Sequence, residues 1–237
     1  MLGVLGGMGP MATVDFMAKV IRATPASRDQ EHISMEVCSA TEIPDRTAAI
    51  LGLGPDPLPA MCAALRRLEH AGASVIAMPC STAHHWHDRL QSKSEARILH
   101  IVEAVADRLA EEGAERGRLG ILATTGTVMA GIYRKRLERR GIDCLSPPAA
   151  DQAEVMRAIG LVKGGDVAAA RGILDRQARA LIAAGCDRVV MACTEIPLAL
   201  TGDASVQAER LIDPTDALAL AAVRACTCAG ARMPIAA

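Results

Sequence analysis

The sequence predicts an α/β protein with parallel sheets, made of two similar halves that face each other across a cleft. Two observations support this prediction. Short apolar runs alternate with amphipathic stretches along the chain, as is typical of parallel strands joined by helices. The same order of strand, turn and helix then occurs twice, with matching residues at a nearly constant spacing. Hydrophobic residues make up 51% of the 237-residue chain, so burial is not limiting for either half.

Apolar runs and helical periodicity place the individual elements. Four runs are predicted to be buried strands: residues 1–6, 74–79, 119–123 and 188–192. Amphipathic patterns predict helices at 11–22, 57–71, 83–91, 99–112, 128–140, 151–162, 166–184 and 214–228. The last helix can be capped by Asp213 or Thr215, and Pro214 suits its first turn. It lies beyond the repeat, so we expect it to pack back onto the first half.

An internal repeat relates the two halves. Its first part pairs residues 2–12 (LGVLGGMGPMA) with 119–130 (LGILATTGTVMA), at an offset of 117 residues. Its second part pairs 71–82 (AGASVIAMPCST) with 184–195 (AGCDRVVMACTE), at an offset of 113 residues. Active sites in parallel sheets lie beyond the carboxyl ends of the strands. Residues at matched positions of facing halves are therefore expected to meet in the cleft.

Composition excludes several classes of partner. The net charge is -1 and no basic stripe stands out, so a polyanion such as nucleic acid is not expected. The aromatic residues are Phe16, Trp86 and Tyr133, too few for base stacking. No apolar run approaches the ~20 residues of a membrane span, and the N-terminus does not resemble a signal peptide. Eight cysteines without a CxxC pair are expected to be free thiols in the reducing cytoplasm.

Cys80 and Cys193 occupy matched positions of the repeat, each after a predicted strand and before a probable helix. A lone cysteine is more often a buried core residue, but a matched pair in one cleft favours function. Free backbone N–H groups at such a turn stabilise a thiolate, so we expect lowered thiol pKa values. Two thiols on opposite faces of a carbon suit proton transfer, in which one removes a proton and the other returns one to the opposite face.

Hydroxyl and cationic residues accompany the two cysteines. Ser81, Thr82 and Thr194 can cap the following helices or bind a carboxylate. Arg46 and Lys163 form another matched pair, at the offset of 117 residues. Two cations converging on the cleft would bind a second carboxylate, which Arg can do bidentately. Taken singly, either residue would be an ordinary surface cation.

The histidines near Cys80 raise the alternative of a metal site. Cys80, His84 and His87 could share a metal, and His85 lies between the two histidines. The second half has no matching histidines and the spacing fits no known zinc motif, so we expect no metal. His84 is instead expected to orient Cys80 or the loop beside it. Glu195 is expected to do the same for the second cysteine or to tune its pKa.

Four motifs, in this order and spacing, resemble the aspartate/glutamate racemase family: GGMGPMAT (6–13), IPDRT (43–47), MPCSTAH (78–84) and CTEIPL (193–198). The resemblance spans nearly the whole chain. It implies two Rossmann-like lobes with parallel sheets related by pseudo-two-fold symmetry, and an active site in the cleft between them. It also implies racemisation without pyridoxal phosphate and, usually, a homodimer. The turn 6–10 (GGMGP) lacks the spacing of a dinucleotide loop, so we expect no cofactor.

The resemblance also assigns roles to individual residues. Cys80 and Cys193 match the two catalytic bases of the family. The positions that contact the α-carboxylate or α-amino group match Met8, Thr82, Thr125 and Thr194, and the cations that hold the distal carboxylate match Arg46 and Lys163. Ser81 stands where the family usually has Asn, and its shorter side chain loses an amide contact to substrate. The second motif reads CTE rather than the CTH common in dedicated glutamate racemases, which favours aspartate or a broader acidic substrate.

We therefore predict a cofactor-independent racemase of aspartate, with glutamate second, that uses a two-base thiol/thiolate mechanism on one small acidic amino acid. The predicted N-terminal lobe comprises residues 1–103 plus 212–237, and the C-terminal lobe comprises 104–211. One alternative is a related enzyme of another small carboxylate, such as a maleate isomerase, a one-cysteine decarboxylase or a hydantoin racemase. A second is a non-catalytic dicarboxylate-binding protein, and a third is a redox protein with Cys80 and Cys193 as its disulfide couple.

Overall fold

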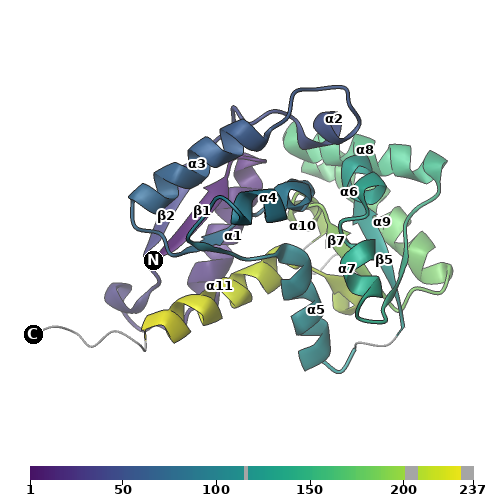
Figure 1. Ribbon diagram of the computed structural model, residues 1–237. Helices are drawn as coiled ribbons and strands as arrows, with labels where there is room; N and C mark the ends of the chain where they lie inside the picture. The colour runs from purple at the N-terminus through teal and green to yellow at the C-terminus, as the bar shows by residue number, and fades with distance from the viewer. Residues whose placement is uncertain (115–116, 201–207, 231–237) are drawn as a thin grey trace, which may run out of the picture.

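Two parallel sheets of four strands form the centres of two lobes in the computed structural model, which describes residues 1–114, 117–200 and 208–230, the last three as backbone (Figure 1). The first sheet has the order β2-β1-β3-β4, with strands Leu2–Gly6 (β1), Met35–Ser39 (β2), Val75–Ala77 (β3) and Arg97–Ile98 (β4). The second has the order β6-β5-β7-β8, with strands Arg118–Ala123 (β5), Asp143–Leu145 (β6), Arg188–Ala192 (β7) and Leu211–Ile212 (β8). The predicted α/β fold with two similar lobes is confirmed.

Strand pairing reproduces the two sequence offsets. Leu2 of β1 pairs with Val75 of β3, and Leu119 of β5 pairs with Arg188 of β7. Leu119 lies 117 residues after Leu2, and Arg188 lies 113 residues after Val75, which are the two offsets of the sequence repeat. Equivalent strands therefore have equivalent neighbours, and the cysteines that follow β3 and β7 leave the two sheets at corresponding places.

Helices connect the strands and cover the sheets. The α-helices are Pro10–Ala23 (α1), Arg46–Ile50 (α2), Leu58–His70 (α3), His87–Gln91 (α4), Ile101–Glu111 (α5), Thr125–Ala130 (α6), Arg134–Glu138 (α7), Ala149–Lys163 (α8), Val167–Ala183 (α9), Ile196–Leu200 (α10) and Pro214–Gly230 (α11). Short 3₁₀ helices span Asp29–Glu31 (η1), Thr82–Trp86 (η2) and Ala208–Arg210 (η3).

Two helix predictions need correction. The single helix predicted over 128–140 is wrong, because α6 ends at Gly131, whose positive φ of 65° is the left-handed conformation that closes many helices. The helix predicted over 83–91 begins instead as the 3₁₀ helix η2 and becomes α-helical at His87. Four strands were also not predicted. β4, β6 and β8 have two or three residues, and β2 is a partly exposed edge strand of mixed sequence.

The helices that follow the fourth strand of each sheet cross between the lobes. α11 follows β8 of the second sheet but packs on α1, α5 and β3, as its yellow ribbon in Figure 1 shows, so the predicted return to the first half is confirmed. α5 follows β4 of the first sheet and contacts α7 of the second lobe. A central core contains residues of both sheets and both helices, among them Leu2, Leu119, Val105 and Leu218. The division at residues 103 and 212 stays a proposal, and its first boundary falls inside α5.

A buried ion-pair cluster fixes the start of α11 to α1. Lys19, which is 5% exposed, contacts Asp15 at 2.5 Å and Asp213 at 2.6 Å. Asp213 also accepts the backbone N–H groups of Thr215 and Asp216 and so caps α11.

Replacing Lys19 with Met should lower the free energy of unfolding by about 3 kcal/mol, because it leaves two carboxylates without their cation, one of them deeply buried. Urea unfolding followed by the fluorescence of Trp86, which is 3% exposed, measures this change. Arg157→Ala, which breaks an exposed pair with Glu154, is the matched control and should have little effect. Equal stability losses in the two variants would contradict this role for Lys19.

Candidate active site

The two matched cysteines line one small cavity between the lobes. Cys193 follows β7 directly, whereas Met78 and Pro79 separate Cys80 from the end of β3. The cavity is about 20 Å³ and is lined by Met8, Asp45, Arg46, Thr47, Cys80, Ser81, Thr82, Thr124, Lys163, Cys193, Thr194 and Glu195. This is room for about one water molecule, so the cavity must widen before an amino acid can enter. Both cysteines are free thiols.

The lining includes every predicted site residue except Thr125. Its neighbour Thr124 lines the cavity instead, while the Thr125 N–H group contacts the sulfur of Met156. Asp45, Thr47 and Thr124 were not predicted. The first two flank Arg46 in the IPDRT motif, and Thr124 caps α6 by accepting the Thr127 N–H at 3.1 Å. Their positions beside predicted residues were the available sequence signal.

Burial and the carboxylate of Glu195 together favour the protonated state of Cys193. The thiol of Cys193 donates to Glu195 Oε2 at 3.0 Å, and both side chains are at least 95% buried. Burial, and then the negative charge of Glu195, raise the pKa of Cys193 well above its usual value. The predicted lowering of the thiol pKa is therefore wrong for Cys193, because desolvation and a like charge outweigh the backbone N–H groups. This cysteine is a protonated thiol near neutral pH.

The same carboxylate joins the two lobes. Its Oε1 atom accepts the Gly9 N–H at 3.1 Å, so Glu195 links the turn after β1 with the turn after β7. A Cβ atom at Gly9 would stand 2.7 Å from Glu195 Oε1, so a larger residue at this position would displace the carboxylate oxygen. Gly126, the repeat partner of Gly9, approaches the other lobe in the same way, since a Cβ there would lie 2.9 Å from Thr47 Cα.

His84 fixes the backbone of the Cys80 loop, as the sequence analysis expected. Its Nε2 atom accepts the Ile101 N–H at 3.1 Å, which leaves the proton on Nδ1 to donate to the Cys80 carbonyl at 2.9 Å. Burial lowers the pKa of His84 to about 3, so the ring is neutral at physiological pH. Because Ile101 begins α5, the ring ties the cysteine loop to a helix that contacts both lobes.

Hydroxyl groups close the cavity from both sides. Thr82 Oγ1 lies 2.9 Å from the Oγ1 atoms of both Thr124 and Thr127 in the second lobe. Ser81 Oγ lies 3.0 Å from the Tyr133 hydroxyl, and Thr194 Oγ1 donates to the Pro79 carbonyl at 3.1 Å. These contacts all cross between the lobes, so opening of the cavity breaks them together.

The two predicted cations line the cavity but differ in setting. Arg46 opens α2 and is 9% exposed, with its guanidinium donating to the carbonyls of Ile43, Pro44 and Met8. Its buried Nε has no hydrogen-bond partner within the described chain. Lys163 ends α8, is exposed, and its charge acts to lower the pKa of Cys193. The two residues therefore match in sequence offset, but one begins a helix and the other ends one.

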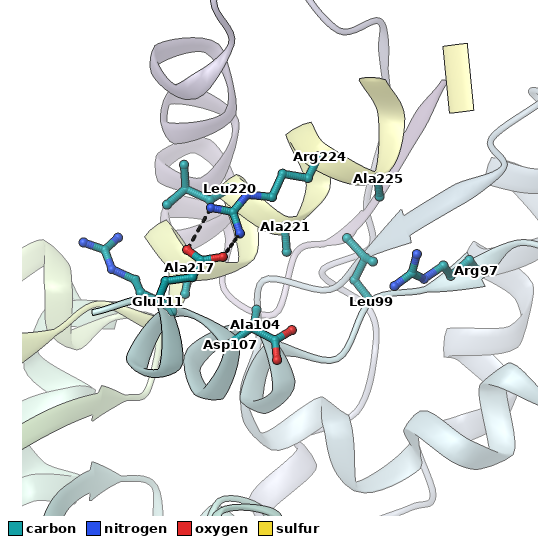
Figure 2. A pocket seen from close by; sticks show the side chains of 11 residues that line it. Arg97, Leu99, Ala104, Asp107, Glu111, Ala217, Leu220, Ala221, Arg224 and Ala225 are labelled. Atoms are coloured by element: carbon teal, nitrogen blue, oxygen red, sulfur yellow. Dashed lines mark hydrogen bonds and ion pairs between the residues drawn. The ribbon is translucent and has the colours of Figure 1, made fainter. Parts of the chain in front are cut away.

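A second hollow, about 270 Å³, lies between α5 and α11 (Figure 2). Its floor is alanine and leucine, and the ion pair of Arg224 with Glu111 crosses it. Its lining contains none of the cysteines, so it is not the candidate active site. Among the residues that the structure describes, no group of three or more His, Cys, Asp or Glu side chains is placed to hold a metal ion. None of the described helices is long and apolar enough to cross a membrane.

Fold and cavity together define a two-lobed α/β protein with a cysteine-lined cavity between the carboxyl ends of two parallel sheets. The chain belongs to the Asp/Glu/Hydantoin racemase family, whose family model matches residues 5–222.

Individual relatives agree with this assignment. The structure is similar to the aspartate racemase of Picrophilus torridus, with 31% identity, a TM-score of 0.85, and coverage of 95% of this chain and 94% of that one. The sequence is 28% identical to the broad specificity amino-acid racemase RacX of Bacillus subtilis, over 83% of this chain and 86% of that protein. The glutamate racemase of Francisella tularensis, 14% identical, shares the fold with a TM-score of 0.71 over all of this chain and 84% of its own.

The depressed pKa of His84 predicts a loss of stability in acid. The pKa of His84 is 6.5 in the unfolded chain and about 3 in the folded protein. The fold therefore has its full stability above pH ~6.5, and it loses the contribution of His84 as the pH falls toward about 3. Between pH ~6.5 and ~5 the loss from His84 should be about 2 kcal/mol.

Urea unfolding at these two pH values, compared between the parent protein and His84→Asn, measures this contribution. The variant should lose less stability because Asn does not titrate. His70→Asn, an exposed histidine, is the control and should behave like the parent. The prediction fails if the pH dependence of His84→Asn equals that of the parent.

Proposed function

We propose that this protein is a cofactor-independent racemase that interconverts L- and D-aspartate, with glutamate as the second candidate substrate. The observation that carries the proposal is the meeting of Cys80 and Cys193, which leave two equivalent sheets at matched positions, in one cavity between the lobes. Membership of the racemase family and the similarity to an aspartate racemase support the same reaction.

The protonation of Cys193 indicates which cysteine acts first as the acid. Cys193 holds its proton against Glu195, so it acts first as the acid, and Cys80 acts first as the base. The Cys80 thiolate removes the α-proton, and the C–H electron pair remains on the substrate as an enolate-like anion. The Cys193 thiol then gives its proton to the opposite face of the carbon. One turnover inverts the stereocentre and leaves Cys80 as the thiol and Cys193 as the thiolate.

Charge develops on the α-carboxylate while the proton is in transit. The hydroxyls of Ser81, Thr82, Thr124 and Thr194 line the cavity and are candidates to hold that carboxylate. Preorganised donors of this kind stabilise the anion more than water does, because they need no reorganisation during the reaction. The lobes exclude water when they close, which strengthens these contacts further.

A second carboxylate on the substrate is selected by Arg46. Its guanidinium is buried, retains an unpartnered Nε–H, and makes no ion pair with any described residue. A buried cation without an acidic partner is costly, so an acidic substrate group would complete its coordination. Lys163 faces the same cavity from the other lobe. The Met8 carbonyl, which Arg46 contacts, connects this carboxylate site to the β1 turn.

The proposal also includes the finer properties implied by the family resemblance. These are two catalytic cysteines, independence from pyridoxal phosphate, a homodimer and a cytoplasmic location. The free thiols of the described cysteines support a reducing compartment.

Incubation of L-aspartate with the purified protein in D₂O tests the reaction. Proton NMR should show loss of the α-proton signal, and chiral analysis should show the D form, without added cofactor. Cys80→Ser and Cys193→Ser should each lower kcat/KM on the order of 10³-fold, because each removes one proton-transfer group. Cys62→Ser, a buried free cysteine outside the cavity, is the matched control and should retain activity.

A parallel sample of L-glutamate sets the substrate preference. No α-proton exchange with either amino acid would contradict the proposal and favour a different small carboxylate or a non-catalytic binding protein. Full activity in Cys80→Ser would contradict the role of the two thiols while leaving the family assignment intact.

The Glu195→Gln variant tests the asymmetry of the two cysteines. Removing the negative charge lowers the pKa of Cys193, so the alkaline limb of the kcat/KM profile should move to lower pH in the direction that needs Cys193 as the acid. In the opposite direction, where Cys193 is the base, activity should begin at lower pH. Glu154→Gln, an exposed carboxylate on α8, serves as the control. Profiles that do not shift in either direction would rule out electrostatic control by Glu195.

A further inference from the structure

A further polar cavity, distinct from the hollow between α5 and α11, lies between the lobes beside the candidate active site. It is about 230 Å³ and is lined by His84, His85, Asp88, His100, Ala130, Gly131, Ile132, Lys135, Arg136 and Arg139. The 3₁₀ helix η2 lines both cavities, since Thr82 faces the cysteines whereas His84 and His85 face this second space. The opposite wall is the turn after α6 and the helix α7 of the second lobe.

Positive charge exceeds negative charge around this cavity. Arg136 is neutralised by ion pairs with Asp88 and Glu103, each at 3.3 Å. Lys135 of α7 and Arg139, the residue directly after this helix, have no ion pair with any described residue and lie four residues apart, where like charges repel. Lys135 lies close enough to the first lobe to act on His85. The pKa of His85 is lowered first by burial of its ring and then by the charge of Lys135. The cavity is therefore short of a negative group.

The largely buried residue His100 also offers a hydrogen-bond donor to this cavity. The ring of His100 is held between the rings of His84 and His87, with centroids 4.7 Å from each, and the residue is 8% exposed. Its Nδ1 atom accepts the Val102 N–H at 3.2 Å, so the proton of the neutral ring is on Nε2. That N–H makes no hydrogen bond to a described residue. The Nε2 atom is not among the fully buried polar atoms that lack a partner, so it is open to the cavity, where a ligand or water can accept its proton.

We propose that this cavity binds a small phosphate dianion, free or as the phosphate group of a monoester, through Lys135, Arg139 and the N–H group of His100. Two cations and a neutral imidazole donor match the charge and the acceptor oxygens of such a group. The bound anion joins η2 of the first lobe to α7 of the second and relieves the repulsion between Lys135 and Arg139.

Occupancy of this cavity also bears on the neighbouring one. His84, which lines this cavity, donates to the Cys80 carbonyl. Tyr133, which directly precedes α7, contacts the Ser81 hydroxyl. A ligand that holds α7 against η2 therefore holds both contacts to the cysteine loop. The binding itself is independent of any racemase activity and can be measured without substrate.

Isothermal titration of the full-length protein with inorganic phosphate, at constant ionic strength, tests the proposal. We expect one site per chain and at least tenfold weaker binding in the double variant Lys135→Ala/Arg139→Ala. Arg134→Ala changes the charge of the same helix outside the cavity and should bind as the parent does. Arg46→Ala removes the buried cation of the candidate active site and should also leave binding unchanged.

A second titration with glycerol 3-phosphate distinguishes the two sources of the dianion. Equal affinities support a site for inorganic phosphate, and at least tenfold tighter binding of the ester supports a site for a phosphorylated metabolite. The proposal is overturned if neither compound binds, or if binding is lost in Arg46→Ala and retained in the Lys135/Arg139 double variant. The latter result would place the anion in the cysteine cavity.

Discussion

The contact on which the site depends most is the carboxylate of Glu195, shared between a thiol and a backbone amide of the other lobe. One oxygen accepts from Cys193 and the other from Gly9, so one side chain both favours the protonated thiol and joins the two lobes. A Cβ atom at position 9 would displace this carboxylate, and the threonine contacts between the lobes lie along the same interface. Closure and chemistry are therefore coupled, because any movement that separates the lobes also changes the surroundings of Cys193.

The two halves supply a symmetric scaffold with asymmetric chemistry. The repeat that pairs Cys80 with Cys193 also places Thr82 opposite Glu195, so a hydroxyl stands in one half where a carboxylate stands in the other. The backbone of Cys80 is held by neutral His84, whereas Cys193 is held through its own thiol. The proposed reaction needs groups on both faces of a carbon, with different protonation at the start of each turnover. The departures from the repeat give the two cysteines the different surroundings that this proposal requires.

Much of this arrangement could be predicted from the sequence. Strand and cysteine positions followed from the repeat, and strand pairing has the same offsets. The break at Gly131 was missed because a helical pattern continues across it, and Thr124 was missed by one residue in a Thr-Thr pair. The pKa of Cys193 was predicted in the wrong direction, because backbone turns are visible in a sequence while desolvation is not. The polar cavity lined by His84, His100 and Arg139 could not be predicted, because it forms only when α7 lies beside η2 and no local sequence pattern reveals that contact.

The crossing of α5 and α11 has a consequence for how the chain folds during synthesis. The helix that covers α1 of the first lobe is α11, which lies after the second sheet in the sequence, so the first lobe leaves the ribosome with an apolar face uncovered. It must wait for the second sheet and then for residues 214–230 before its core is complete. Domains of this size often fold in order from the N-terminus as they emerge. Here the first lobe made is completed only after the second sheet and α11 have been made.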